Sequence, residues 1–221
     1  MKTTTLSVSG VLKSSEPIIT DRLIIRPLTE KDFQAWSDAI ASGAQSSRSV
    51  SGAEMQVPTS QRNLADFQER LKYYRNLREN DRFYHFSAFD RANPSVILGS
   101  LSLTILERLI IQRAVIGYHI FPNYQRQGFA AESVKALLAF AFNELSLHRV
   151  EALIEVTNRP SSALALAVGM KKEGTLRKAI YDDGSGRGSE SWKDALLFSA
   201  VAEDFGIKCM KPSVRLEIKD H

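Results

Sequence analysis

The chain has 221 residues, of which 43% are hydrophobic and 24% charged, values ordinary for a soluble globular protein with one core. Its formal net charge of +4 is mild: it suits an anionic ligand but gives no basic block or aromatic-interleaved basic stripe that would indicate direct nucleic-acid binding. Cys209 is alone, the four histidines lack zinc-ligand spacing, and no apolar run resembles a secretory signal or a membrane span, so we expect a cytoplasmic protein without a metal site.

Two helices and three strands are predicted before residue 110. After a polar, aperiodic N-terminal arm at residues 1–17, alternating apolar side chains favour a strand that ends near Pro27. The pattern Thr29-x-x-Asp32 is typical of a helix start, and apolar residues at helical spacing predict a second helix. The predicted elements are a strand at 22–28, a helix from residue 29, a loop at 42–58, a helix within 59–80, strands at 83–89 and 97–106, and a hairpin extension at 107–113.

The C-terminal half alternates strands and helices and ends in a hairpin. Pro160 suits the first turn of a short helix. The predicted elements are a strand at 114–121, a helix at 130–145, a strand at 149–156, a helix at 160–168, and antiparallel strands at 171–181 and 191–201 joined by a polar turn at 182–189. Because no repeat or linker divides the chain, we expect one domain at 18–206 and a tail at 207–221, with an α/β (α+β) fold whose helices cover both faces of a mixed sheet.

The hexapeptide Gln125–Ala130 stands where the predicted strand at 114–121 leads into the helix at 130–145. Glycine and alanine remove side-chain bulk there, and the first N–H groups of a helix have no intrahelical acceptor. A pyrophosphate can dock against them at the positive end of the helix dipole, with Arg126 adding charge. The hexapeptide therefore predicts a phosphate-binding turn without a P-loop lysine or a GxGxxG pattern, although a tight turn alone would use the same small residues.

The hexapeptide resembles the coenzyme A signature of the GNAT superfamily of N-acetyltransferases, (Gln/Arg)-x-x-Gly-x-(Gly/Ala), through Gln125, Gly128 and Ala130. The resemblance covers residues 20–204 and is strongest to the ribosomal-protein N-terminal acetyltransferase (RimJ/RimL-type) branch. Several motifs in the same order are far more specific than any one of them. The further motifs are the segments 20–26 (TDRLIIR), 116–120 (IGYHI) and 147–152 (LHRVEA), Asn158-x-x-Ser161, Val168-Gly169-Met170-x-x-Glu173-Gly174, and Trp192-x-Asp194.

This resemblance implies the GNAT fold: a mixed, mostly antiparallel, seven-stranded sheet with helices on both faces, splayed between strands 4 and 5. The splay admits the pantetheine arm of acetyl-CoA, which is the implied cofactor and would pair with the backbone of the fourth strand. The implied cofactor-binding residues are Ile120, Phe121, Gln125, Arg126, Gln127, Gly128, Phe129, Ala130, Ala131 and Asn158.

Acetyl transfer from a thioester to an amine needs a neutral amine, a donor for the oxyanion and a proton for the leaving thiolate. In the family a base is common at the start of the fourth strand and a tyrosine acid follows the fifth; here these positions hold Ala114 and Ala165. The resembled branch instead carries Asn158, which would hydrogen-bond the pantetheine amides, and Ser161, which would serve the thiol. Both could instead simply cap the helix that begins near Pro160.

Tyr118 is expected to border the splay, where its hydroxyl could orient substrate; a buried core tyrosine is the alternative. We therefore assign Ser161 and Tyr118 as the catalytic candidates. His119 should point to the opposite face by strand alternation and is expected to serve packing. Three carboxylates remain as candidate bases, each better explained as solvated or structural: Glu54, Asp81 and Glu155.

The leading hypothesis is an acetyl-CoA-dependent N-acetyltransferase in which a primary amine attacks directly within a ternary complex. The resembled branch favours a protein N-terminal amine, as on a ribosomal protein. A small amine (amino acid, polyamine or antibiotic), transfer of a longer acyl group, and a non-catalytic acyl-CoA-binding sensor stay open. An acidic acceptor pocket would favour a polycation. A homodimer is the prior for the oligomeric state.

Overall fold

The computed structural model describes residues 16–43, 62–182 and 190–208. Almost all of the predicted N-terminal arm, C-terminal tail, loop at 42–58 and turn at 182–189 lies outside this range. The helices are α1 (Phe33–Gly43), α2 (Leu64–Glu79), α3 (Phe129–Asn143) and α4 (Arg159–Ala167). The strands are β1 (Ile18–Ile19), β2 (Leu23–Arg26), β3 (Phe83–Asp90), β4 (Ile97–Glu107), β5 (Arg113–Ile120), β6 (Arg149–Glu155), β7 (Lys171–Asp182) and β8 (Ser191–Val201).

The strands form one sheet in the order β1-β2-β3-β4-β5-β6-β8-β7. Every neighbouring pair is antiparallel except β5 and β6, which run parallel because α3 carries the chain back across the sheet between them. The predicted mixed, mostly antiparallel α/β sheet is thereby confirmed. The count of seven strands was wrong by one, because Ile18 and Ile19 add a two-residue edge strand beside β2.

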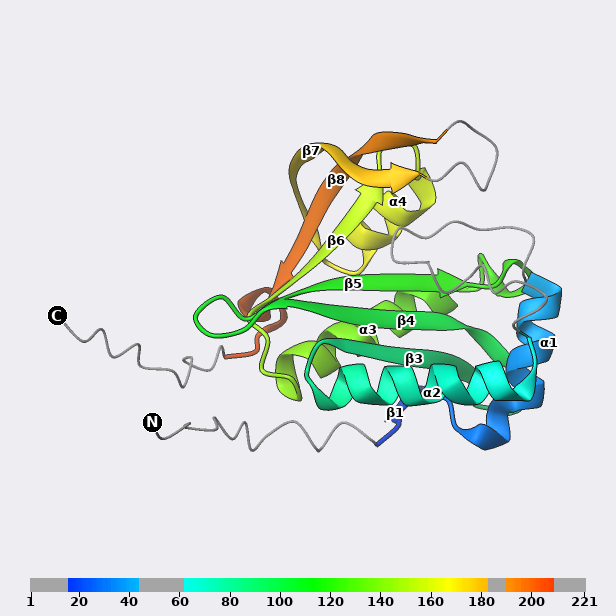
Figure 1. Ribbon diagram of the computed structural model, residues 1–221. Helices are drawn as coiled ribbons and strands as arrows, with labels where there is room; N and C mark the ends of the chain where they lie inside the picture. The colour runs from blue at the N-terminus through cyan, green and yellow to red at the C-terminus, as the bar shows by residue number, and fades with distance from the viewer. Residues whose placement is uncertain (1–15, 44–61, 183–189, 209–221) are drawn as a thin grey trace, which may run out of the picture.

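Strands β5 and β6 are paired over only three residues, from Arg113–Arg149 to Val115–Glu151. Beyond this point they diverge, and Figure 1 shows β6, β7 and β8 rising away from β5 as a separate arm. At the closed end, the Glu151 carboxylate accepts a hydrogen bond from Arg149 Nε at 2.7 Å and lies 3.6 Å from Arg113 Nη1. The splay expected between the fourth and fifth strands is present, between β5 and β6. The contacts of Glu151 with Arg149 and Arg113 lie at its closed end, where the two strands are paired.

Helices cover both faces of the sheet, as predicted. Helices α1 and α2 pack against β3 and β4 on one face, while α3 and α4 pack against β4, β5, β6 and β7 on the other (Figure 1). The α3 face buries large apolar side chains such as Phe86, Leu103 and Leu137 in the main core. A smaller core joins α1, α2 and the strand ends through Trp36, Phe67 and others.

Local signals in the sequence placed most element boundaries within a few residues. The capping box of Thr29 and Asp32 is present, although it opens a 3-10 turn at Glu30–Asp32 and α1 follows from Phe33. Helix α2 starts at Leu64 because the Asn63 side chain caps it by accepting the Asp66 N–H at 3.0 Å.

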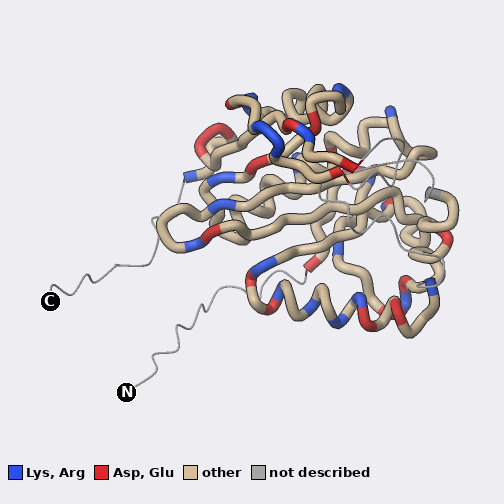
Figure 2. Tube along the Cα trace, turned by 45° about the horizontal axis from the view of Figure 1, so that its top comes forward, with Lys and Arg blue, Asp and Glu red and all other residues tan. Residues whose placement is uncertain are grey.

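Within the described residues, no helix is long and apolar enough to cross a membrane. Figure 2 shows lysine and arginine interspersed with aspartate and glutamate along α2, whereas the central strands are almost free of charge. The net charge of the chain is therefore not gathered on this helix.

Candidate active site at the splayed strands

The predicted phosphate-binding turn lies at the open end of the splay, between β5 and α3. Gly128 is the N-cap of α3 in the left-handed conformation, with φ of 84°, and no side chain caps the helix. A Cβ atom built on Gly128 would stand 3.2 Å from Arg22 Nη2. The N–H groups of the first turn, which have no intrahelical acceptor, are thus left available to an anion, with space that glycine keeps clear.

A buttress behind this turn, formed by Thr20, Arg22 and Glu132, was missed from the sequence. The Glu132 carboxylate accepts hydrogen bonds from Arg22 Nε at 2.7 Å and Thr20 Oγ1 at 2.5 Å. Arg22 also donates from Nη1 to the Gln127 carbonyl at 2.9 Å and lies over the Phe129 ring. Burial alone would raise the pKa of Glu132, but the hydrogen bonds from Thr20 and Arg22 hold it below its usual value. The carboxylate nearest the turn is therefore charge-compensated.

The two glutamines of the hexapeptide shape the turn with their side chains. Gln125 donates from Nε2 to the Ile120 carbonyl at 2.8 Å, and Gln127 donates to the Asn123 carbonyl at 3.2 Å. Arg126 is exposed, with φ of 61°. Of the three side chains, Arg126 is the one available to add positive charge near a phosphate.

Tyr118, Asn158 and Ser161 come together across the splay. Tyr118, on β5, donates its hydroxyl hydrogen bond to the Ser161 carbonyl at 3.2 Å. The Ser161 N–H donates to Asn158 Oδ1 at 3.1 Å, so Asn158 caps α4, as the alternative interpretation predicted. Capping occupies only the amide oxygen: among the described residues, Asn158 Nδ2 has no hydrogen-bond partner. The donor that a pantetheine carbonyl needs is thus still available.

The hydroxyls of this cluster differ in what they can do. Burial raises the pKa of Tyr118 to about 12, so the phenol is protonated at neutral pH. The half-buried Ser161 Oγ makes no hydrogen bond within the described part of the chain. A serine hydroxyl both donates and accepts. Ser161 can therefore pass a proton to a leaving group, while Tyr118 holds the first turn of α4 against β5.

The other candidates are placed away from this role. His119 is 6% exposed and packs edge-on against Phe121, with ring centroids 5.4 Å apart, which confirms the expected packing role. Asp81 accepts two hydrogen bonds from Arg108 and is structural. Glu155 accepts the Thr157 hydroxyl at 2.8 Å, and Glu54 lies outside the described residues.

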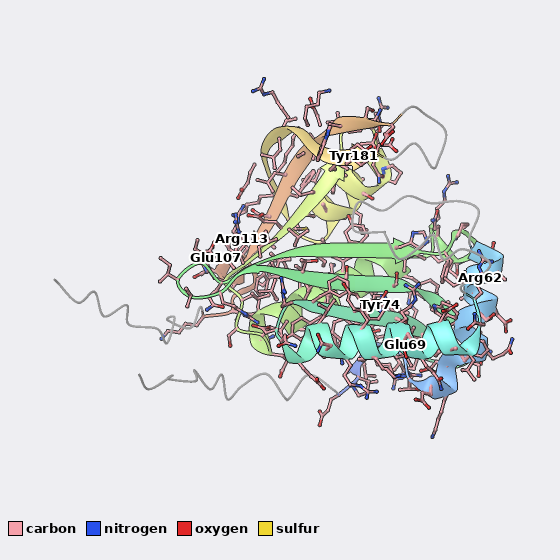
Figure 3. The ribbon with its side chains drawn as sticks, in the orientation of Figure 1. Arg62, Glu69, Tyr74, Glu107, Arg113 and Tyr181 are labelled. Carbon is pink, nitrogen blue, oxygen red and sulfur yellow. The ribbon has the colours of Figure 1, made fainter. Side chains whose placement is uncertain are left out.

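A pocket that is open to solvent lies on the other face, between α1, α2 and the sheet. Trp36 and Tyr74 line it, and Figure 3 shows Tyr74 on α2 in front of the sheet. Ser87, Ser100 and His119 lie in one cross-strand row beneath the helices. This polar row was missed from the sequence, although polar residues at alternate strand positions signal it.

An exposed aromatic pair marks the arm on the far side of the splay. Tyr181 on β7 and Trp192 on β8 are cross-strand partners with ring centroids 5.2 Å apart, and they are 47% and 55% exposed. Their pair lies beyond the last pairing of β6 with β8, Glu155 with Ala195, and so stands at the open end of the splay. Figure 3 shows Tyr181 on this arm.

Comparison with known proteins identifies the family to which this chain is similar. Residues 22–171, more than half of the chain, match the family model "Acetyltransferase (GNAT) domain". The uncharacterized N-acetyltransferase YoaA of Bacillus subtilis is 29% identical over 174 residues, covering 76% of this chain and 91% of its own. The ribosomal protein uS5-alanine N-acetyltransferase of Escherichia coli is 22% identical over 188 residues, covering 85% and 92%. The structure of Mycobacterium smegmatis RimJ in complex with CoA-disulfide has a TM-score of 0.67 at 21% identity, covering 88% and 93%.

Proposed function

Because the chain belongs to the GNAT acetyltransferase family, and so is an N-acetyltransferase that uses acetyl-CoA, we propose that its acceptor is the N-terminal amine of a protein. The observation that carries this proposal is that Ala114 and Ala165 stand where a base and an acid are usual. The uncapped start of α3, beside a splay bridged by the Tyr118–Ser161 hydrogen bond, supports the cofactor site. It offers an anion site and a hydroxyl on opposite sides of one opening. These features suit the pyrophosphate and the thioester of acetyl-CoA.

The cofactor supplies an activated acyl group, so the protein needs no covalent nucleophile. Its residues bind the cofactor and orient it toward the acceptor amine. The first turn of α3 with Arg126 would bind the pyrophosphate, and Asn158 Nδ2 would donate to a pantetheine carbonyl. The Ser161 hydroxyl would relay to the departing sulfur the proton that the attacking amine loses, so that the hydroxyl is regenerated, with Tyr118 fixing the position of α4. Proximity within this opening would supply much of the rate.

An N-terminal amine suits a site in which no base is assigned. With a typical pKa of about 7.7–8.0, roughly one α-amino group in ten is neutral at pH 7, whereas a lysine-like amine with a pKa of about 10.4 is neutral in fewer than one molecule in a thousand. The positions of the usual base and acid hold Ala114 and Ala165, both fully buried. An acceptor that is already partly neutral therefore fits these residues better than an alkyl amine.

Two further observations support a protein acceptor. The Tyr181–Trp192 pair offers exposed aromatic surface beside the opening, of the kind that binds peptides well. The related E. coli enzyme is named for an alanine of ribosomal protein uS5. We propose that this chain acts on such a terminus in the cytoplasm, where protein synthesis exposes new N-termini.

The test is calorimetric titration with acetyl-CoA, followed by thiol release in the presence of N-terminal peptides, polyamines or amino acids. Binding with release on peptides is the expected result. Release on small amines alone would replace the protein acceptor with a metabolite, and binding without any release would indicate a sensor of acyl-CoA. An absence of binding would remove the role assigned to the turn at Gly128.

A further inference from the structure

The pocket between α1, α2 and the sheet adjoins the edge at which the reaction is proposed. Phe121 lines the pocket and directly follows β5, whose open edge faces the splay. Its N–H donates to the Leu98 carbonyl at 2.9 Å, which fixes the end of β5 on β4. Ser100, also in the lining, is the cross-strand partner of His119 on β5. An acceptor amine at the β5 edge can thus have its own side chain in this pocket.

The pocket walls are mainly aromatic and aliphatic. Trp36 packs on Phe67 with ring centroids 4.8 Å apart, and the Tyr74 ring lies 4.7 Å from that of His85. Ile40 adds an aliphatic wall. These ring contacts fix the positions of the side chains that line the pocket, both on the helices and on the sheet. Such walls favour an apolar or aromatic group, because its transfer from water is favourable.

Charge in the lining opposes a cationic acceptor. Among the described residues that line the pocket, Arg70 is the one with a permanent charge, and no carboxylate is present. Arg70 Nη1 donates to the Tyr74 hydroxyl at 3.1 Å, which holds the guanidinium at the pocket wall. A polyamine needs a carboxylate for each additional ammonium group, and Arg70 would repel it.

The carboxylates near the pocket do not offset the positive charge of Arg70. Asp32, at the start of α1, is bound by both terminal nitrogens of Arg26 at 2.7 and 2.8 Å. Glu69, on α2, is paired with Lys72 at 2.6 Å and its side chain is 71% exposed. Figure 3 shows Glu69 and Tyr74 on the same helix. Both acids are therefore engaged by a cation outside the pocket.

We propose that this pocket receives the side chain of the first residue of the acceptor protein and selects an apolar or aromatic residue over a basic one. The inference rests on the proposed function, since it assigns the acceptor specificity of the same site. It divides acceptors by chemistry: N-termini that begin with leucine, methionine or phenylalanine are substrates, while polyamines and N-termini that begin with lysine are poor ones.

The experiment measures thiol release from acetyl-CoA by the full chain, with peptides identical except for the first residue and with spermidine. We expect kcat/KM for a phenylalanine or leucine start to exceed that for a lysine start by at least about tenfold, as hydrophobic pockets discriminate. Equal values for all first residues, or a preference for spermidine, would overturn the pocket assignment. Failure of every amine would instead overturn the proposed function, so the two failures are distinguishable.

Two pocket variants and one matched control test whether the pocket causes this preference. Arg70→Glu should reduce the preference for phenylalanine over lysine by about tenfold, because the repelling charge becomes attractive. Lys72→Glu makes the same charge change on the outer side of α2 and should leave the preference unchanged. Ala39→Leu should reduce kcat/KM for the phenylalanine peptide by about tenfold but spare an alanine peptide, since it narrows the pocket. An equal response of Arg70→Glu and Lys72→Glu would overturn the proposal, with unchanged acetyl-CoA affinity as the check on folding.

Discussion

The two faces of the central strands β3, β4 and β5 are both buried, yet they differ in chemistry. Toward α3, the inward side chains are apolar, as with Tyr84, Phe86 and Leu103, all 0% exposed. Toward α1 and α2, the inward side chains include His85 and Ser87, at 7% and 2% exposure. The same strands therefore bury an apolar core on one side and, on the other, a smaller core that includes polar side chains.

This difference suggests that the face toward α3 mainly stabilises the fold and that the face toward α1 and α2 serves the proposed function. A close-packed apolar face stabilises the fold through burial and dispersion. Buried polar side chains cost free energy unless they are hydrogen-bonded, and natural proteins retain such costs chiefly at functional sites. The polar row of Ser87, Ser100 and His119 leads to the edge of β5 beside the pocket. The face beneath α1 and α2 is thus the one that the proposed acceptor would meet.

The largest expected effect is the loss of a core side chain on the α3 face. Phe86→Ala should lower the free energy of unfolding by about 3–5 kcal/mol, because it removes a buried ring that packs edge-on against Phe140. Ser102→Ala, on the opposite face of the neighbouring strand, should cost less than about 1 kcal/mol. Urea denaturation of both variants checks this contrast. Equal losses would mean that both faces contribute alike to stability.

The second prediction asks whether the helix over the apolar face also binds ligand. Gly128→Glu should weaken acetyl-CoA binding by at least about 100-fold, since it adds an anion and a side chain where φ is 84° and Arg22 is 3.2 Å away. Calorimetry measures the affinity. Gly128→Ala, which adds bulk without charge, should weaken binding less.

An unchanged affinity in a folded Gly128→Glu variant would contradict the phosphate-binding role of the turn. A thermal melt without ligand is the control, because it reports the strain of a side chain at positive φ separately from ligand binding.

The third prediction concerns the pH dependence of the polar face. Burial lowers the pKa of His119 from 6.5 to about 4, so the folded protein keeps this imidazole neutral while the unfolded chain protonates it below pH 6.5. Between pH 6.5 and 4 the unfolded state binds more protons, and stability falls as pH falls, by about 2 kcal/mol from this group. His119→Gln should flatten the slope in this window relative to the wild type. Denaturation curves at pH 7 and pH 4.5 compare the two, and parallel slopes would exclude the contribution.

The smallest expected effect is at the Ser161 hydroxyl on α4, across the splay from β5. Ser161→Ala should lower kcat about tenfold with unchanged acetyl-CoA affinity, if the hydroxyl serves only the departing thiol. Ser162→Ala is the matched control, since its hydroxyl donates to the Asn158 carbonyl at 3.2 Å within the same helical turn. Stopped-flow thiol release and calorimetry separate the two quantities. Identical kinetics in both variants would leave Ser161 with the role of an ordinary first-turn residue of α4.

Much of this architecture was predictable because its signals are local. Alternation predicted the strands, helical spacing and caps such as Asn63 predicted the helices, and the small residues around Gly128 predicted the turn that begins α3. The splay was predictable only by resemblance to a family, since no local pattern states that β5 and β6 separate after three pairs.

The side-chain partners were decided by the tertiary structure. Glu132 meets Arg22 from 110 residues away, and Gln125 turns back to the Ile120 carbonyl. The pocket lining likewise comes from α1, α2, β3, β4 and the residue after β5, which is why its lack of a carboxylate among the described residues could not be predicted from the sequence. Backbone conformation and the periodicity of burial are set by neighbouring residues, and sequence alone determined them here. Which distant side chains share a site depends on how the elements pack, and that is decided by the free energy of the whole fold.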